Sequence, residues 1–376
     1  MSHWRDVLVC TVGTSLKTNL EKSEEAGIRS ALEQKNVKGL SLELLNQSPE
    51  DRLCGAEINS ITSIIKKGHL NNKRRLVYLV SDTEDGKFLG QVLTQYYENH
   101  NNPYQFQKVE FHPLEGLADA TPKRFRTEGL RNLVRAIAQV VNEEGSETMV
   151  INATGGYKAQ IAFAGMIGQA LEIPVCYLFE RFSEVIELPP QPISLDLSFW
   201  LENVDQFYDL ADNEARENPS QRDHRFATLV DAIDINGQTV IGLSPVGQLF
   251  HETFRHRFKI QRQRILPPAS GIAPEEKAIK YEDQNSKKHS GLSYYLGRIR
   301  KVPYVNRLYT HYYNPGLPGK NYFRKSATGE VSQIEGGYSD GKALTKFDVV
   351  TTAVTSAQRD AALADLREQL QTKKWG

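Results

Sequence analysis

The sequence has few of the residues that mark disulfide-rich, zinc-binding or membrane-spanning proteins. Only Cys10, Cys54 and Cys176 occur in 376 residues. An odd number of widely spaced cysteines argues against a disulfide framework and a structural zinc site, and favours reduced thiols in the cytoplasm. No segment approaches the roughly 20 apolar residues that a helix needs to cross a bilayer. The first residues carry no basic leader and apolar block, so we expect no secretory signal.

The chain also lacks a net charge, with 46 Lys and Arg against 46 Asp and Glu, but the charge is unevenly distributed. Residues 1–254 hold 24 basic and 35 acidic residues, whereas residues 255–330 hold 16 basic and 5 acidic residues. The basic segment also contains many tyrosines, which is typical of an RNA-facing surface. The alternative is a solvated face above core tyrosines. With 39% apolar residues, the chain can build two or three globular domains.

Strand and helix patterns alternate in the first 190 residues. The expected strands are residues 6–13, 75–82, 106–113, 148–156, 173–181 and 183–189. Helical patterns lie between most of them, and the last two strands are close enough to form a hairpin. This order predicts an α/β, Rossmann-like domain with a mostly parallel sheet.

Two boundaries divide the rest of the chain into a connector, 191–254, and a basic domain, 255–376. The prolines of 189–194 end the first domain, 1–190. In the connector, a strand pattern precedes Ser244 as the N-cap and Pro245 as the first residue of a helix. This arrangement resembles a winged helix, although few basic residues lie where a DNA-reading helix needs them.

The basic domain is expected to be a small α+β fold. Helical pieces come first and are broken at Pro267, Pro268 and Gly291. Strand patterns then follow at 305–315, 319–326, 330–336 and 344–355, before a final helix at 356–370. Two helices followed by an antiparallel sheet would build this domain.

Two strand-end loops suit an anionic ligand. Gly13, Thr14 and Ser15 follow the first strand, whereas Thr154, Gly155, Gly156 and Lys158 follow a later one. Both loops should lie at the carboxyl edge of the sheet, where glycines and free amides accept phosphate. Neither a Walker A sequence nor GxGxxG is present, so an NTPase or dinucleotide site is disfavoured. The loop that contains Asp82 and Thr83 should lie at the same edge, and these two residues are expected to complete the ligand pocket.

The segments VCTVGTSL and INATGGYK resemble the CARF domains of type III CRISPR accessory proteins, over about residues 5–190. This resemblance implies a homodimer that binds cyclic oligoadenylate, with cyclic tetra-adenylate as the expected activator. No other cofactor is expected. The implied ligand-binding residues in the two motifs are Thr11, Gly13, Thr14, Ser15, Leu16, Asn152, Thr154, Gly155, Gly156, Tyr157 and Lys158.

The basic domain fits metal-free RNA cleavage better than two other nuclease types. Arg307 and His311 are one residue too close for a HEPN motif and lie in a strand pattern, and no ExK pair lies on a strand. The latter disfavours a metal-dependent nuclease, so we expect no metal. Basic helices followed by an antiparallel sheet resemble the RelE family of mRNA interferases. The combined resemblance implies a CARF–RelE fusion that cleaves mRNA on the ribosome.

The candidate catalytic residues of this domain are cations and proton-transfer groups. Arg307, Arg324 and Lys325 are expected on facing strands as cations for the phosphate and the transition state. Strand alternation places Arg307, His311 and Tyr313 on one face, with His311 or Tyr313 as acid or base. Lys288 and His289, next to Lys287, are further candidates, and Tyr312 and Tyr338 could stack on bases. A structural role for each remains an alternative.

Two other functions remain open. One is a transcriptional regulator in which the winged-helix-like segment binds DNA. The other is a ring nuclease, in which the ligand pocket cleaves its own cyclic oligoadenylate. The primary prediction is a cytoplasmic homodimer in which cyclic oligoadenylate binds the first domain and activates metal-independent RNA cleavage by the basic domain, and these two functions are its alternatives.

Overall fold

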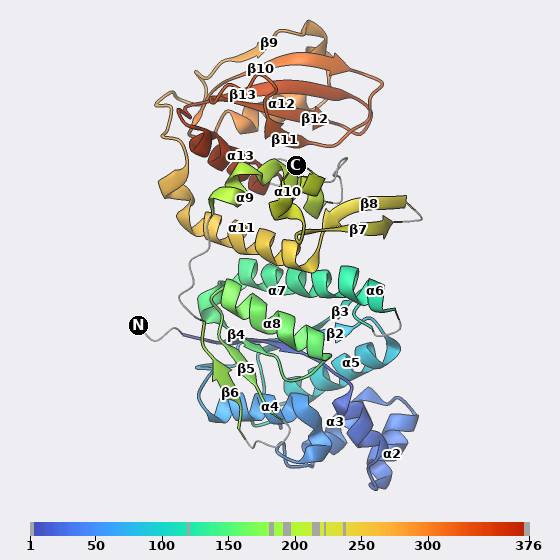
Figure 1. Cartoon of the computed structure of the whole chain (residues 1–376). Coiled ribbons are helices and arrows are strands. Elements are labelled where there is room, and N and C mark those ends of the chain that lie inside the picture. The colour runs from blue at the N-terminus through green and yellow to red at the C-terminus, as the bar shows by residue number, and fades with distance from the viewer. Residues whose placement is uncertain are drawn as a thin grey trace. The chain divides into compact units, whose positions relative to one another are not determined.

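The computed structural model describes residues 4–118, 121–179, 184–190, 197–212, 219–221, 223–235 and 238–371. The chain divides into two compact units. Unit 1 comprises residues 1–194, 224–233 and 243–253, and unit 2 comprises residues 195–223, 234–242 and 254–376. Each unit contains its own sheet (Figure 1). The predicted domain limits at residues 190 and 254 stay a prediction.

Unit 1 contains a six-stranded sheet in the order β3-β2-β1-β4-β5-β6. Its strands are β1 (Val7–Thr11), β2 (Arg75–Ser81), β3 (Lys108–Leu114), β4 (Met149–Asn152), β5 (Val175–Tyr177) and β6 (Ile186–Leu188). All neighbours pair in parallel except β5 and β6, which pair antiparallel. The predicted α/β fold with a mostly parallel sheet is therefore confirmed, as is the terminal hairpin.

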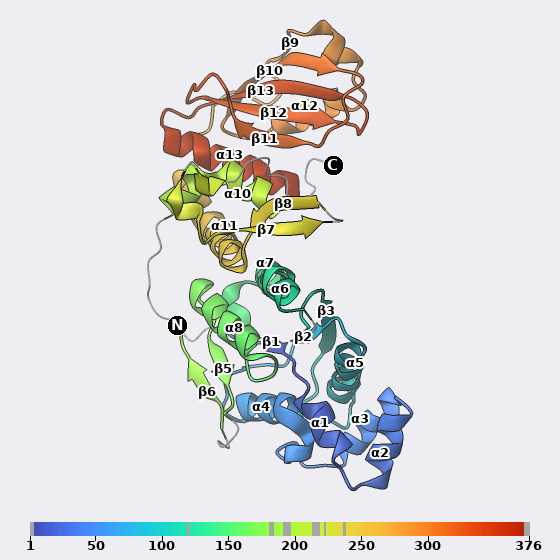
Figure 2. The ribbon, with the colours of Figure 1, turned by 45° about the vertical axis from the view of Figure 1, so that its right-hand side comes forward.

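Helices cover both faces of this sheet (Figure 2). They are α1 (Ser15–Glu21), α2 (Ala26–Glu33), α3 (Val37–Leu45), α4 (Gly55–Lys66), α5 (Glu84–Glu98), α6 (Pro122–Arg124), α7 (Leu130–Glu144) and α8 (Lys158–Ala170). In β1, Leu8 and Cys10 pack with residues of α1 to α5, whereas Val7 and Val9 pack with residues of α7 and α8. Because both faces are buried, the strand is a continuous apolar run.

The middle of the chain contains α9 (Ser198–Glu202), α10 (Val204–Ala211), the two-stranded sheet of β7 (Val230–Ile235) and β8 (Gln238–Leu243), and α11 (Pro245–Ile265). Ser244 Oγ accepts the backbone N–H of Gly247 at 3.0 Å, which is the N-cap contact that the sequence predicts. The predicted order of strand, cap and helix is confirmed here. The helix continues past residue 254 to Ile265.

Unit 2 contains a five-stranded sheet in the order β11-β12-β13-β10-β9. Its elements are β9 (Ile279–Tyr281), α12 (Leu292–Ile299), β10 (Val305–Asn314), β11 (Tyr322–Lys325), β12 (Gln333–Ser339), β13 (Leu344–Thr351) and α13 (Ser356–Gln371). The four strands predicted after residue 304 are present and pair antiparallel. The helical expectation for residues 279–281 is wrong, because β9 joins the sheet edge parallel to β10.

Short turns of other helix types complete the described chain. They are the 3-10 helices η1 (Arg52–Cys54), η3 (Ser146–Thr148), η4 (Pro219–Gln221), η5 (His224–Phe226) and η6 (Gln284–Lys288), and the π-helical turn η2 (Phe125–Gly129). None of the helices in the described ranges combines the length and apolar character that a membrane span requires.

Candidate functional site

A cavity of about 70 Å³ opens at the carboxyl edge of the sheet in unit 1. Its lining residues are Val12, Gly13, Thr14, Ser81, Gly86, Gly156, Tyr157 and Gln160. They come from the ends of β1 and β2, from the first turn of α5, and from the loop before α8 and the first turn of that helix. The cavity thus brings together residues of the two glycine-containing loops, which are about 140 positions apart in the sequence.

The two loops approach each other so closely that a side chain at Gly13 would not fit. A Cβ atom at Gly13 would lie 2.6 Å from the backbone nitrogen of Gly156. Gly156 itself has a φ of +108°, a conformation that favours glycine. These glycines therefore allow two backbone segments to meet at one edge of the sheet.

Glu57, in the first turn of α4, contacts both loops, and the sequence analysis does not predict this residue as part of the site. The Glu57 carboxylate accepts the backbone N–H of Gly13 at 2.9 Å and the hydroxyl of Ser15 at 3.1 Å. Its side chain is buried in the first turn of α4. A Cβ atom at Gly155 would lie 2.5 Å from Glu57 Oε1, so the carboxylate also lies against the second loop. An acidic residue in a helical first turn is common, and nothing in the sequence identifies its loop partners.

Four of the predicted ligand-binding residues are buried within the framework of the loops. Thr11 Oγ1 donates to the carbonyl of Gly155 at 2.5 Å. Asn152 Nδ2 donates to Ser60 Oγ at 2.8 Å, and Thr154 Oγ1 donates to Asn152 Oδ1 at 2.7 Å. Leu16 is fully buried in the core. These side chains hold the loops in place, and their direct contact with a ligand stays a prediction.

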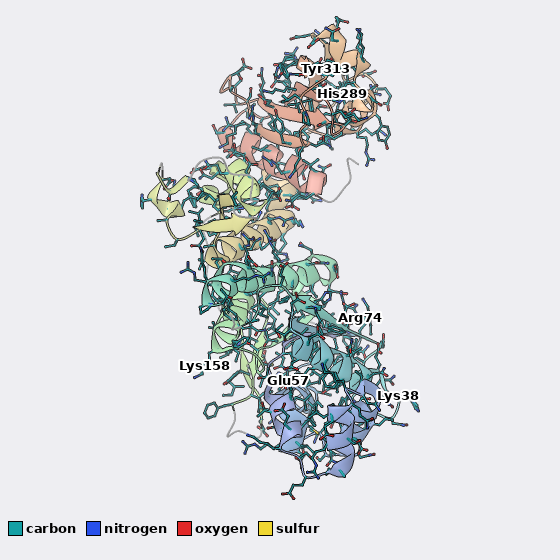
Figure 3. All side chains as sticks on the ribbon, turned by 90° about the vertical axis from the view of Figure 1, so that its right-hand side faces the viewer. Lys38, Glu57, Arg74, Lys158, His289 and Tyr313 are labelled. Carbon is teal, nitrogen blue, oxygen red and sulfur yellow. The ribbon has the colours of Figure 1, made fainter. Side chains whose placement is uncertain are left out.

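The predicted ligand-binding residues Asp82, Thr83 and Lys158 differ in their side-chain contacts. Asp82 forms an ion pair with Lys87 at 2.7 Å, and Thr83 Oγ1 caps α5 by accepting the N–H of Gly86 at 3.0 Å. Lys158 is exposed at the start of α8 and is labelled in Figure 3. In the described part of the chain, no carboxylate pairs with Lys158. Its ammonium group can therefore reach an anion above the loops.

In unit 2, polar side chains gather on one face of the five-stranded sheet, which we call the polar face. Its members are Arg307, Tyr309, His311 and Tyr312 of β10, Lys346 and Asp348 of β13, Glu335 of β12, and Tyr322 and Arg324 of β11. The other face carries apolar residues such as Leu308, Phe323 and Phe347. The polar face contains more cations than carboxylates, and both carboxylates are buried near its centre.

A β-bulge at His311 changes which tyrosine belongs to this face. Thr310 pairs with Phe347, but Tyr312 already pairs with Lys346, so His311 is the extra residue. The Lys346 ammonium lies 5.2 Å from the Tyr312 ring centre, whereas the Tyr313 ring lies 5.4 Å from that of His289 on the opposite face. The prediction that Tyr313 shares a face with Arg307 and His311 is therefore wrong. Regular alternation fails beyond the bulge.

On the polar face, His311 and Asp348 form the pair of side chains best suited to acid–base chemistry. His311 Nε2 lies 3.5 Å from Asp348 Oδ2. Burial raises the pKa of Asp348 above its ordinary value, against the lowering effects of His311 and Tyr309. Burial and the negative charge of Asp348 raise the pKa of Tyr309 to about 12, so its hydroxyl stays protonated at neutral pH. Asp348 can thus hold one imidazole nitrogen and leave the ring ready to exchange a proton.

The predicted placement of Arg307, Arg324 and Lys325 on facing strands is wrong. β13 and β12 lie between β10 and β11, so Arg307 and Arg324 are separated by about 14 Å at the usual strand spacing. Arg324 pairs with Glu335 at 2.6 Å on the polar face. Lys325 instead lies 3.6 Å from Asp360 of α13 and donates to the carbonyl of Glu202. These contacts give Lys325 a structural role.

His289 lies in an aromatic cluster away from the polar face (Figure 3). Its Nδ1 lies 2.7 Å from Thr345 Oγ1, and its Nε2 lies 3.5 Å from Asp340. Hydrogen bonds from the Ala343 and Lys342 amides lower the pKa of Asp340 to about 2. The order threonine, histidine and aspartate resembles a nucleophilic triad. Thr345 is completely buried, however, so this geometry favours a structural role.

The remaining candidates, Lys288 and Tyr338, lie apart from the polar face. Lys288 is exposed in η6, and its Nζ lies 3.4 Å from Asn285 Oδ1. Tyr338 donates its hydroxyl to the carbonyl of Ser290 at 2.9 Å, next to the His289 ring. Among the described residues, no group of three or more His, Cys, Asp or Glu side chains is arranged to hold a metal ion.

Comparison with known protein families finds a match within unit 1. Residues 52–191 match the CRISPR-associated protein family Cas_APE2256. That segment includes the second loop and Glu57. No curated protein matches the sequence.

Two solved structures are distantly similar. Can2 from Sulfobacillus thermosulfidooxidans, in complex with cyclic tetra-adenylate, is 12% identical over 69% of this chain and 68% of that chain, with a TM-score of 0.25. Protein VC1899 from Vibrio cholerae is 9% identical over 92% of this chain and 77% of that chain, with a TM-score of 0.23.

Proposed function

We propose that the protein is a cyclic oligoadenylate-activated endoribonuclease of type III CRISPR defence. The observation that carries this proposal is the meeting of the two loops at one cavity, where Gly13 lies against Gly156. The match of residues 52–191 to CRISPR-associated proteins supports the same role. Cyclic tetra-adenylate is the activator to test first, because it is the activator expected from the CARF resemblance of the two loop motifs.

The pocket would hold the phosphates of the ring through outward-facing groups of the two loops. Thr14 and Lys158 are exposed at the rim and can donate to phosphate oxygens. A ring-shaped anion suits a two-fold axis, because each subunit of a homodimer then supplies half of the donors. Thr11, Asn152 and Thr154 would act by holding the loops, as their buried hydrogen bonds suggest.

The polar face of unit 2 is the surface that best suits RNA cleavage. In metal-independent cleavage the ribose 2′-hydroxyl attacks the adjacent phosphorus, the bond from phosphorus to the 5′-oxygen breaks, and the leaving 5′-oxygen takes up a proton from water. His311, oriented by Asp348, would take the proton of the 2′-hydroxyl. Arg307 would stabilise the charge that develops on the phosphate. An RNA strand across the sheet would then meet Arg324 farther along its backbone, beyond the adjacent nucleotide.

Helix α11 favours this nuclease over a DNA-binding regulator. Arg255 pairs with Glu368 at 2.5 Å, Lys259 with Glu368 at 3.2 Å, and Arg262 with Asp365 at 3.4 Å. Three basic side chains of α11 therefore form ion pairs with residues of α13. A DNA-reading helix needs such side chains for phosphates and bases.

The deciding experiment compares cleavage of naked mRNA and of mRNA undergoing translation, each with and without cyclic tetra-adenylate. The naked-mRNA arms contain EDTA, and metal-depleted protein is used in the translation arms because ribosomes require Mg²⁺. We expect ligand-dependent cleavage, with the translated mRNA as the preferred substrate. Specific binding of duplex DNA without RNA cleavage would overturn the proposal in favour of a regulator. Conversion of the cyclic ligand to linear products without RNA cleavage would favour a ring nuclease.

A further inference from the structure

Glu57 is a buried carboxylate in an unusual position for a phosphate-binding pocket. Its side chain is 1% exposed, and it accepts hydrogen bonds from two donors of the first loop, Gly13 N–H and Ser15 O–H. Such donors usually serve a bound phosphate. In this protein the Glu57 carboxylate already accepts hydrogen bonds from both donors. A ligand at the first loop must therefore bind close to a buried negative charge.

Within the described ranges, no cation offsets this charge at close range. Among the described residues, no Lys, Arg or His lies within ion-pair distance of the Glu57 carboxylate. The two loop donors and the first turn of α4 are what stabilise it. Its charge also acts on its surroundings: after burial, the negative charge of Glu57 is a further cause of the raised pKa of Tyr78 and of Cys10.

The carboxylate lies between both ligand loops. A Cβ atom at Gly155 would be 2.5 Å from Glu57 Oε1 and 3.0 Å from the Gly13 nitrogen. A neutral side chain such as glutamine could keep one hydrogen bond to Gly13 and one to Ser15 without the cost of a buried charge. The charge itself therefore points to a role beyond fixing the loop.

We propose that Glu57 is a specificity-determining residue, whose charge makes the pocket select phosphodiesters over terminal phosphate monoesters. This inference rests on the proposed function. Each phosphodiester of a cyclic oligoadenylate carries one negative charge, whereas a terminal monoester carries nearly two at neutral pH. Repulsion by a fixed carboxylate grows with the ligand charge and is strong in a partly dehydrated site. Intact rings are thus retained and linear phosphorylated fragments are rejected.

The test compares the wild-type protein with Glu57→Gln, because glutamine can accept from Gly13 and donate to Ser15. The probes are cyclic tetra-adenylate and linear tetra-adenylate with a 3′-phosphate, titrated by calorimetry. We expect the wild type to bind the cyclic probe at least tenfold more tightly. In Glu57→Gln this preference should fall at least fivefold, mainly through tighter binding of the linear probe.

A second variant keeps the inference testable if Glu57→Gln does not fold. Ser15→Ala removes one donor from the carboxylate and leaves its charge less neutralised, so the preference for the cyclic probe should rise at least twofold. A preference that stays constant in a folded variant that still binds the cyclic probe overturns the inference alone. If the wild type binds neither probe, the proposed function and this inference both fail.

Discussion

The two sheets of this protein present their candidate functional groups in different ways. In unit 1 they lie on loops at the ends of parallel strands, where Gly13 and Gly156 bring backbone groups together. In unit 2 they are side chains on the face of a mostly antiparallel sheet, and Arg307, His311 and Asp348 come from two neighbouring strands. A strand-end site depends on short sequence motifs, whereas a sheet-face site depends on register.

The difference also affects how each site tolerates change. A loop site that is built from backbone groups responds to substitutions that move the backbone, such as a side chain at Gly13. A face site responds to the loss of single charges. The following experiments test this contrast, beginning with the largest expected effect.

The double substitution Arg307→Ala and His311→Ala should reduce ligand-stimulated RNA cleavage at least 100-fold, because it removes a proton acceptor and a phosphate cation. Cleavage rates at saturating cyclic tetra-adenylate measure this effect. Affinity for the ligand should stay within twofold of the wild type. Lys301→Ala, an exposed change after α12, is the matched control. If the double variant cleaves RNA at the wild-type rate, the polar face is not the active site.

Acid should weaken unit 2 through Glu368. Burial alone would raise its pKa, but Arg255, Lys259 and Tyr208 outweigh burial and lower the pKa from 4.5 to about 2. Because the unfolded chain takes up the proton first, this stabilisation is complete above about pH 5 and is lost as the pH falls towards 2. It amounts to roughly 3 kcal/mol of unfolding free energy. Urea unfolding from pH 6 to 2.5 measures it.

The control for that experiment is Glu368→Gln, which cannot titrate. Its unfolding free energy should vary less with pH than that of the wild type over the same range. Equal pH dependence in both proteins would show that other groups cause the acid sensitivity.

Lys158→Ala should weaken the binding of cyclic tetra-adenylate about tenfold, because it removes one charge-assisted hydrogen bond to phosphate. The matched control is Lys38→Ala, an exposed lysine of α3 that is labelled with Lys158 in Figure 3. Isothermal calorimetry measures both affinities. An equal loss in the two variants would indicate a general charge effect, and no loss in either would place the ligand away from Lys158.

The smallest expected effect concerns a local cap in unit 1. Asn36 Oδ1 accepts the N–H of Gly39 at 2.9 Å at the start of α3. Asn36→Ala should lower the stability of this helix by about 1 kcal/mol. Amide exchange in α3 should become faster, while exchange in β10 to β13 stays unchanged. Asn36→Asp, which keeps the capping oxygen, should behave like the wild type.

Several elements could be predicted because local sequence determines them. The apolar runs of β1, β2 and β4 have to be buried on both faces, and the cap Ser244 defines the start of α11. The two glycine-containing loops were predicted at one edge of the sheet for the same reason, since parallel strands end together. β9 escaped prediction because three residues are too few to show a period.

The remaining features depend on contacts between distant segments. Glu57 and its loop partners are more than 40 positions apart, and only the packing of α4 brings them together. The bulge at His311 shifts Tyr313 to the other face, although its sequence is that of a regular strand. The strand order that separates Arg307 from Arg324 is likewise a tertiary result.

The sequence by itself therefore determined the α/β order of unit 1, its strand-end loops and the basic character of residues 255–330. These features follow from hydrophobic period, turn residues and composition, which act over a few neighbouring positions. Only the tertiary structure decided which side chains meet, because register, bulges and strand order are fixed by long-range pairing. That is why the pocket loops were found from motifs, whereas Glu57 and the His311–Asp348 pair required the fold.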